Sequence, residues 1–158
     1  MAKGCDSSWD FDYKSRVDAL VDEGYTFIGR YLNHSAGVRN GLTVSEANRL
    51  SNAGVFICAL YESDSGTSIS HFTRSNGIAD AREAISLAED LGMPTGNPIY
   101  FCIDTDVTKS QMTTYIVPYV QGILSELEGS GYKLGIYGPK PVCKYICRGT
   151  GLRRKELQ

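Results

Sequence analysis

Apolar and polar positions follow one another along the chain in a repeating order: an amphipathic segment, a glycine, then a short apolar run. The order is clearest in VDALVDEGYTFIGRYL, ANRLSNAGVFICALYE and LSELEGSGYKLGIYG, where Gly24, Gly54 and Gly131 stand at the junctions. Apolar residues three and four apart predict helices, whereas short runs of β-branched and aromatic residues predict strands. A glycine between them fits the left-handed residue that closes a helix. The pattern therefore predicts successive β/α units.

Applied to the whole chain, the pattern predicts five strands and five helices. The strands are expected near 3–6 and over 26–31, 55–60, 98–103 and 133–137, and the helices over 14–23, 44–53, 78–91, 111–128 and near 141–148. Thr43 with Glu46, and Thr108 with Gln111, have the spacing of a capping box at a helix start. Pro118 predicts a kink in the fourth helix or its true beginning.

Alternating strands and helices imply a parallel sheet, which is either an open doubly wound sheet or a closed barrel. No G-x-G-x-x-G or G-x-x-x-x-G-K-[ST] motif follows any predicted strand. This weakens the nucleotide-binding version of the fold. With 158 residues, of which 42% are hydrophobic, the chain is expected to form a single domain.

Charge and cysteine content narrow the possible partners. The net charge is -2 and no cluster of Lys or Arg stands out, so neither nucleic acid nor an anionic membrane surface is expected as a partner. The start of the chain has no apolar signal-peptide core, and no stretch is long enough to span a membrane. Five cysteines include no C-x-x-C pair, which favours reduced thiols over disulfides or metal ligands. No cofactor is predicted.

Ionisable and aromatic residues stand where the predicted strands end. They are Asp6, Arg30, Tyr31, Tyr61, Glu62, Asp104, Asp106 and Tyr137. Because the carboxyl ends of parallel strands share one edge of a sheet or one end of a barrel, we expect these side chains to line one pocket. His34 and His71 are isolated in the sequence, and surface or hydrogen-bonded loop positions are expected for both.

The segment IYFCIDTDV places two carboxylates directly after an apolar run. At this spacing Asp104 and Asp106 would share one face of an extended chain, and their mutual repulsion would raise the pKa of one of them. A carboxyl group with a raised pKa can donate a proton in glycosidic bond cleavage. The same pair could instead bind a divalent cation through oxygen ligands. The sequence leaves both alternatives open.

These residues also carry a family resemblance. GCDSS, FIGRYL, AGVFICALYES, GIADAREAISLAEDLGMPTGNPIYFCIDTDV and YKLGIYG occur in this order over residues 4–148. Together they resemble the glycoside-hydrolase-like domain of unknown function, a relative of the family 25 lysozymes that is found in proteins associated with cell walls. The resemblance implies a TIM-type (β/α) barrel with an acidic pocket at the strand ends.

Individual positions carry over by motif. Asp6 resembles the aspartate of the lysozyme G-x-D-x-S opening, and Asp104 with Asp106 resembles the D-x-E pair whose glutamate is the general acid. Here that acid position holds an aspartate, which is one methylene shorter. Tyr137 resembles the tyrosine of the I-Y motif after the fifth strand. Arg30 and Glu62 match strand ends of the unknown-function family rather than those of the lysozymes.

If the fold is the barrel that the resemblance implies, the chain is expected to be a truncated version of a longer domain; the alternative is that the five strands form an open sheet complete in itself. Five β/α units would make a partial barrel domain over residues 1–148, followed by a polar tail over 149–158, whereas a closed barrel needs at least roughly 200 residues. Unpaired edge strands would then favour self-association. The family resemblance suggests an extracellular or cell-wall location, whereas reduced cysteines suggest the cytoplasm.

Three functions fit these features. The first is a glycoside hydrolase acting on a peptidoglycan-like polysaccharide, with Asp106 as candidate acid and with Asp6, Glu62 and Asp104 as further catalytic carboxylates. The substrate would be contacted by Arg30, Tyr31, Tyr61 and Tyr137. The second is a carbohydrate-binding module without turnover, which would use the tyrosines Tyr31, Tyr61 and Tyr137, together with Trp9, as sugar platforms. The third is an aspartate-nucleophile phosphatase, because IDTDVT fits a D-x-D-x-T motif, although the acidic pair that should follow the motif is missing.

Overall fold

The structure is a computed structural model that describes residues 1–34, 40–63 and 67–148. The predicted tail over 149–158 lies outside the described residues. The strands are β1 (Gly4–Ser7), β2 (Phe27–Tyr31), β3 (Phe56–Tyr61), β4 (Pro98–Cys102) and β5 (Lys133–Tyr137). Each predicted strand is therefore confirmed, with its ends within one residue of the expected position.

The helical segments include two short ones that the sequence pattern did not separate. They are α1 (Lys14–Asp22), α2 (Val44–Asn52), the 3-10 turn η1 (Ile69–His71), α3 (Arg74–Asp90), α4 (Lys109–Gln111), the π-helical turn η2 (Met112–Ile116), α5 (Val117–Leu127) and α6 (Lys140–Cys147). The helix predicted over 78–91 begins four residues earlier, because the Thr73 side chain caps it by accepting the N–H of Asn76 at 3.2 Å.

The predicted helix over 111–128 is divided by the π-helical turn, and Pro118 follows it in the first turn of α5, where no backbone donor is needed. Both predicted N-caps are present. Thr108 and Gln111 form a reciprocal capping box. At the start of α2, Thr43 accepts the N–H of Glu46, but the Glu46 side chain pairs elsewhere, so only half of that box forms.

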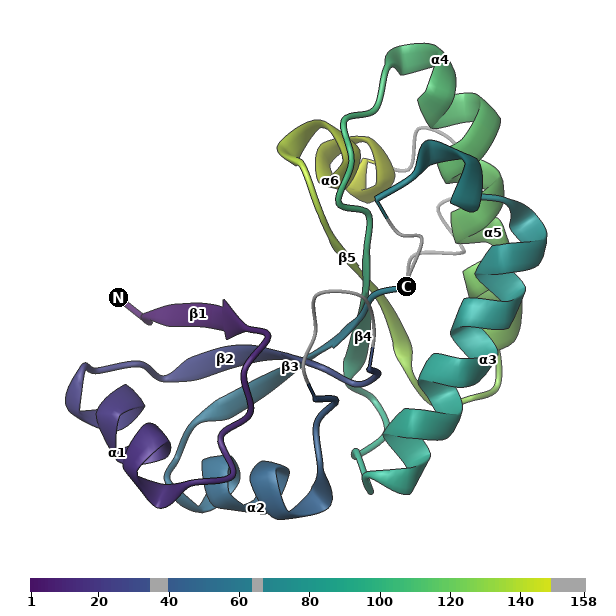
Figure 1. Cartoon of the computed structure of the whole chain (residues 1–158). Coiled ribbons are helices and arrows are strands. Elements are labelled where there is room, and N and C mark those ends of the chain that lie inside the picture. The colour runs from purple at the N-terminus through teal and green to yellow at the C-terminus, as the bar shows by residue number, and fades with distance from the viewer. Residues whose placement is uncertain (35–39, 64–66, 149–158) are drawn as a thin grey trace.

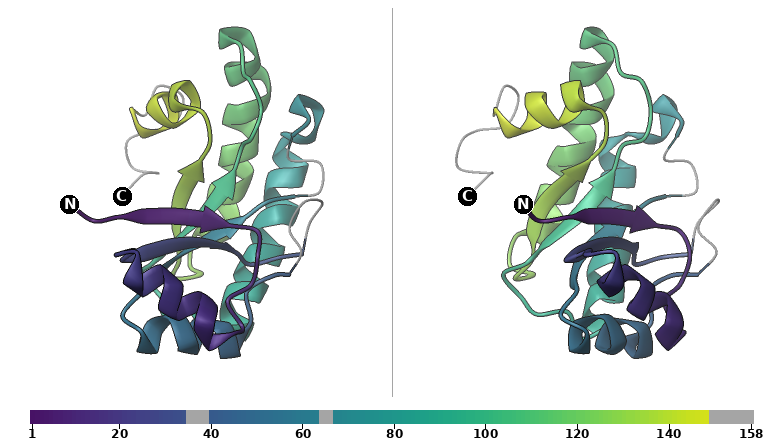
Figure 2. Two further views of the ribbon diagram at one scale, coloured as in Figure 1. Left: turned by 60° about the vertical axis from the view of Figure 1, so that its left-hand side comes forward. Right: turned by 90° about the vertical axis from the view of Figure 1, so that its left-hand side faces the viewer.

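The five strands form one parallel sheet in the order β1-β2-β3-β4-β5. This sequential order argues against a doubly wound sheet, in which the order reverses at a switch point. It is the order of a singly wound β/α barrel. The sheet is open in the described chain, however, so the predicted TIM barrel is not shown; the fold is an α/β fold with a five-stranded parallel sheet. Figures 1 and 2 show the curvature of this sheet.

The longer helices cover one face of the sheet, which we call the helix face. Ile28 and Ile57 pack with the cores of α1 and α2, while Tyr61 and Phe101 pack with those of α3 and α5. The parallel register places these strand residues on the same face. Figure 1 accordingly shows α1, α2, α3 and α5 on one side of the curved sheet.

Glycine permits the closest helix contact. A Cβ at Gly77 of α3 would collide with the backbone oxygen of Tyr119, and one at Gly122 of α5 would collide with that of Arg74. The two helices therefore cross almost backbone to backbone, and Figure 2 shows them side by side. Beside this crossing the buried carboxylate of Asp80 accepts the Tyr119 hydroxyl at 2.8 Å, and the same oxygen lies 2.8 Å from Nε2 of His71. His71 is therefore hydrogen-bonded, but it lies in the 3-10 turn η1 and not in a loop.

Candidate active site

The pleat of each strand decides which strand-end residues can meet. Side chains at alternate positions point to opposite faces, so neighbours such as Arg30 and Tyr31 separate. On the face away from the helices, which we call the open face, Gly29 lies opposite Asp6, and a Cβ at Gly29 would sit 3.1 Å from the Asp6 Cβ. The absence of a side chain at Gly29 leaves the space in which Asp6 sits.

Six side chains from the five strands gather at the carboxyl end of the open face. This group, called the acidic mouth below, comprises Asp6, Tyr31, Glu62, Cys102, Asp104 and Tyr137. Their proximity is evident at Tyr137, because the charges of Asp6, Asp104 and Glu62 all contribute to raising the pKa of its hydroxyl. The structure therefore brings together five of the residues that sequence analysis placed at one pocket.

Glu62 has the environment of a proton donor. It follows directly after β3 and is partly buried, and burial is the main cause that raises the pKa of its carboxyl above 4.5; the nearby Asp104 carboxylate raises it further. The like-charge pair at this site is therefore Glu62 with Asp104. A carboxyl group that keeps its proton towards neutral pH can act as a general acid.

Asn33 fixes the backbone of Glu62. Its side-chain Nδ2 donates to the Glu62 carbonyl oxygen at 2.6 Å, and its Oδ1 accepts the Glu62 N–H at 3.3 Å. Asn33 itself is only 6% exposed. Such a paired amide holds the chain beyond the end of the strand, where no ladder partner is present. No sequence motif pointed to Asn33, because its role depends on contact between two loops.

The tyrosines and the thiol of the mouth are held in their neutral forms. Burial is the largest cause that raises the pKa of Tyr31, Tyr137 and Cys102, and the surrounding carboxylates add to it. Neutral tyrosine hydroxyls can donate hydrogen bonds to a polar ligand. Sequence analysis predicted only reduced thiols and did not place Cys102 at the pocket; its spacing of two residues from Asp104 was the signal that both share a face.

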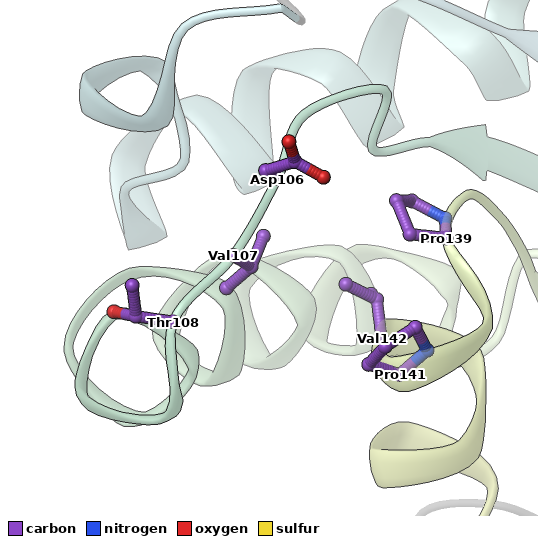
Figure 3. Close-up of a pocket in the computed structure, with 6 residues that line it drawn as sticks. All are labelled: Asp106, Val107, Thr108, Pro139, Pro141 and Val142. Atoms are coloured by element: carbon purple, nitrogen blue, oxygen red, sulfur yellow. The ribbon is translucent and has the colours of Figure 1, made fainter.

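Asp106 lies apart from this group. β4 ends at Cys102 and the chain bends at Thr105, so the extended geometry that would align Asp104 and Asp106 is absent. Asp106 is exposed and lines a pocket of about 240 Å³ between the loop after β4 and the start of α6 (Figure 3). The expected pairing of the two aspartates is replaced by the pairing of Asp104 with Glu62.

Arg30 also departs from the expected pocket. It points to the helix face and is fully buried, with Nε 2.6 Å from Oε1 of Glu46 and Nη2 3.1 Å from Oε2. Its Nη1 donates to the carbonyl of Ser7 at 2.8 Å. The physical reason is parity: on β2 the residue that shares a face with Gly29 is Tyr31. Arg30 therefore joins β1, β2 and α2 and is not positioned to contact a substrate at the mouth.

Tyr61 is likewise on the helix face. It is 2% exposed, packs against the Phe101 ring at a centroid distance of 5.8 Å, and donates its hydroxyl to Glu83 at 2.6 Å. The structure thus removes Tyr61 from the predicted sugar platforms. Trp9, in the loop after β1, is 50% exposed and has the Arg16 guanidinium 5.7 Å from its ring centroid.

In the part of the chain that the structure describes, no group of three or more His, Cys, Asp or Glu side chains is arranged to hold a metal ion. None of the helices in that same part is both long and apolar enough to cross a membrane. The five cysteines are unpaired.

Similar structures support the fold. A Tat-secreted protein of Mycobacterium tuberculosis, Rv2525c, solved in complex with HEPES and in complex with L-tartrate, matches with a TM-score of 0.72 at 24% identity, over 84% of this chain and 67% of that one. An uncharacterized protein of B. stearothermophilus matches with a TM-score of 0.68 at 23% identity, over 92% of this chain and 67% of that one. At these identities the likeness concerns the fold alone.

Curated relatives are longer and themselves uncharacterized. The protein YbfG of Bacillus subtilis is 32% identical over 154 residues, which are 90% of this chain and 21% of that protein. FadG of the same organism is 28% identical over 91% of this chain and 26% of its own length. The chain thus spans about a quarter or less of the curated relatives that it matches. Residues 18–157 match the sequence family described as Rv2525c-like, glycoside hydrolase-like domain, and the chain therefore belongs to that family.

Proposed function

We propose that the protein hydrolyses glycosidic bonds in a peptidoglycan-like cell-wall polysaccharide and that the acidic mouth is its active site. The observation that carries the proposal is the placement of partly buried Glu62 beside Asp104 at the ends of adjacent strands, where burial and the Asp104 charge raise the pKa of the Glu62 carboxyl. Membership of a glycoside hydrolase-like family supports the reaction class. A pair of carboxyl groups, one protonated and one ionised, is what glycoside hydrolysis requires.

In the proposed mechanism the Glu62 carboxyl donates its proton to the glycosidic oxygen. The bond from the anomeric carbon to that oxygen breaks, and its electron pair stays with the departing sugar. Asp104 and Asp6 stabilise the positive charge that develops on the anomeric carbon and ring oxygen. Water then adds to the anomeric carbon and returns a proton to Glu62. Tyr31 and Tyr137, which remain neutral, donate hydrogen bonds to sugar hydroxyls.

The mechanism is tested by comparing variants on purified peptidoglycan and on defined glycan fragments. Glu62→Gln should lower the rate of bond cleavage by a factor of about 10² to 10⁴, because the amide cannot donate a proton to the leaving oxygen. Asp106→Asn, which removes the acid expected from the sequence, should retain far more activity. The reverse ranking would move the acid role to Asp106, and an inactive parent would remove the proposal.

A binding module remains the second candidate because Tyr137 of the mouth and Trp9, three residues after Asp6, are exposed aromatic groups. Tyr137 is 38% exposed and Trp9 is 50% exposed, and both belong to loops or strand ends at the carboxyl end of the sheet. Such rings can stack against sugar faces. A parent protein that binds glycan with no turnover, and that loses binding on Tyr137→Ala, would favour this function over hydrolysis.

The barrel relation also stays a proposal. We infer that the open sheet is one part of a TIM-type barrel related to that of the family 25 lysozymes, with further strands needed to cover the open face. The sequential strand order supports this, as does Phe56, an open-face residue of β3 that is 76% exposed. An uncovered apolar face favours association. Size-exclusion chromatography should then show self-association of this chain, whereas a dilute monomer with one sharp thermal transition would contradict the inference.

A further inference from the structure

The pocket beside Asp106 has walls of a distinct chemistry. Its lining is Asp106, Val107, Thr108, Pro139, Pro141 and Val142. Two prolines and two valines give an apolar surface, and Asp106 stands at the edge with its carboxylate towards Pro139 (Figure 3). Within the described residues this carboxylate makes no hydrogen bond or ion pair. The Thr108 hydroxyl is already used, because it accepts the N–H of Gln111 as a helix cap.

The pocket is formed by the same two loops that carry Asp104 and Tyr137 of the acidic mouth. The loops after β4 and β5 run side by side, since the N–H of Ile103 donates to the carbonyl of Tyr137 at 2.8 Å. Asp104 and Tyr137 belong to the mouth, and two residues further along each loop Asp106 and Pro139 belong to the pocket. A ligand that occupies the mouth therefore has the pocket beside it.

The size of the pocket limits what it can hold. Its volume of about 240 Å³ is below the roughly 300–1,000 Å³ of pockets that enclose a whole small-molecule ligand. It suits a substituent or a single unit of a larger ligand. The apolar walls favour a methyl group, and the carboxylate of Asp106 favours a hydrogen-bond donor attached close to it.

We propose that this pocket is a specificity subsite for the acetamido group of an N-acetylated amino sugar. The methyl group would contact Val107, Pro139 and Val142, and the amide N–H would donate to the Asp106 carboxylate. This inference rests on the proposed function for the identity of the ligand class, and it names the part of the sugar that the protein reads. Asp106 thereby has a role in recognition, separate from proton transfer by Glu62.

Competing substituents fit less well. A carboxylate or phosphate would be repelled by Asp106 and by the carboxylates of the neighbouring mouth. An ammonium group would be attracted by Asp106, but it would give up water against proline and valine side chains that offer no hydrogen bonds. A plain hydroxyl could donate to Asp106 but would leave the apolar walls unfilled. The acetamido group matches both parts of the pocket.

The test is a binding titration followed by NMR of the full chain with N-acetylglucosamine, glucosamine and glucose. N-acetylglucosamine should shift the backbone resonances of Val107 and Val142 and bind about fourfold more tightly than glucose, since its methyl group is buried against the apolar walls, whereas either sugar can donate a hydrogen bond to Asp106. Val107→Phe, which fills the pocket, should abolish this preference, and Asp106→Ala, which removes the acceptor, should weaken the binding of both sugars. Val44→Phe and Asp90→Ala change the same residue types at exposed sites elsewhere and should leave the preference and the binding intact.

Every outcome separates this inference from the proposed function. Preference for N-acetylglucosamine that is lost in Val107→Phe, together with weaker binding of both sugars in Asp106→Ala, supports the subsite, whether or not the parent cleaves glycan. Equal binding of N-acetylglucosamine and glucose, or preference for glucosamine, overturns the subsite even if Glu62-dependent cleavage is found. Absence of binding by all three sugars also overturns it. A parent protein that prefers N-acetylglucosamine but does not cleave glycan would overturn the proposed function alone.

Discussion

Arg30 and Tyr31 are neighbours on β2, and they show how differently the two faces of the sheet use polar side chains. On the helix face Arg30 is fully buried and donates to the Glu46 carboxylate and to the carbonyls of Ser7 and Asn40. On the open face Tyr31 lies among carboxylates that belong to other strands. The charge of Arg30 is paired within the protein, whereas the acidic mouth gathers charges of one sign. The first arrangement holds the fold together, and the second is suited to a ligand.

The largest expected effect comes from breaking the buried ion pair on the helix face. Arg30→Met should destabilise the protein by about 3–5 kcal/mol, because it leaves the Glu46 carboxylate buried without its partner. Chemical denaturation measures the change. The double variant Arg30→Met with Glu46→Leu should recover most of the loss.

Tyr31→Phe is the matched change on the open face, and it should alter the unfolding free energy by less than about 1 kcal/mol. Equal costs for Arg30→Met and Tyr31→Phe would contradict the division between the faces.

The next largest effect on stability is expected from the packing of α3 against α5 on the helix face. Gly77→Ala should cost about 1–3 kcal/mol, because the added Cβ would collide with the Tyr119 backbone oxygen and push α3 away from α5. Ser86→Ala, at an exposed position of the same helix, is the control and should be near neutral or slightly stabilising. Thermal unfolding distinguishes the two. An unchanged Gly77→Ala variant would show that the helices tolerate separation.

Hydrogen bonding offers a similar comparison between two tyrosines. Tyr119→Phe removes one donor from the buried Asp80 carboxylate and should cost about 1–3 kcal/mol, with His71 retained as a partner. Tyr137→Phe, on the open face, should change stability little but should weaken glycan binding. Tyr119→Phe should therefore have the larger effect on the unfolding free energy, and Tyr137→Phe the larger effect on glycan binding. If one variant had the larger effect on both quantities, the division between the two faces would be contradicted.

Local sequence pattern was sufficient to predict the strands, their order and two helix caps. The strands and their order follow from local apolar runs and from helix stops such as Gly24 and Gly54, both of which have positive φ in the structure. Local pattern also finds the capping residues Thr43 and Thr108, because a cap depends on neighbours three residues away.

Contacts between distant segments were out of reach. The pairing of Arg30 with Glu46, and of Asn33 with the Glu62 backbone, depends on loops that are packed together by the whole fold. The face on which each side chain lies could have been predicted, because residues next to each other on a strand point to opposite faces. Arg30 is therefore separated from Tyr31, and Tyr61 from Glu62. The bend at Thr105, which separates Asp104 from Asp106, had no such signal.

The smallest expected effect is a change in the pH dependence of stability. The folded-state pKa of Glu62 is raised, so the folded protein holds this proton at pH values where the unfolded chain has released it. Stability then falls as pH rises from about 4.5 through the raised pKa of Glu62. Glu62→Gln removes this loss, so the variant should be more stable than the parent at neutral pH. The difference should vanish well below pH 4.5, and a constant difference at all pH values would contradict the assignment.

The most direct test of the acidic mouth is a ¹³C NMR titration of the Glu62 side-chain carboxyl in the parent and in Asp104→Asn. We expect a titration midpoint above 4.5 in the parent, because burial and the Asp104 charge both raise the pKa of Glu62. In the variant only burial remains, so the midpoint should be lower. A parent midpoint at or below 4.5, or a midpoint that Asp104→Asn leaves unchanged, would contradict the coupling of Glu62 with Asp104 on which the proposed active site depends.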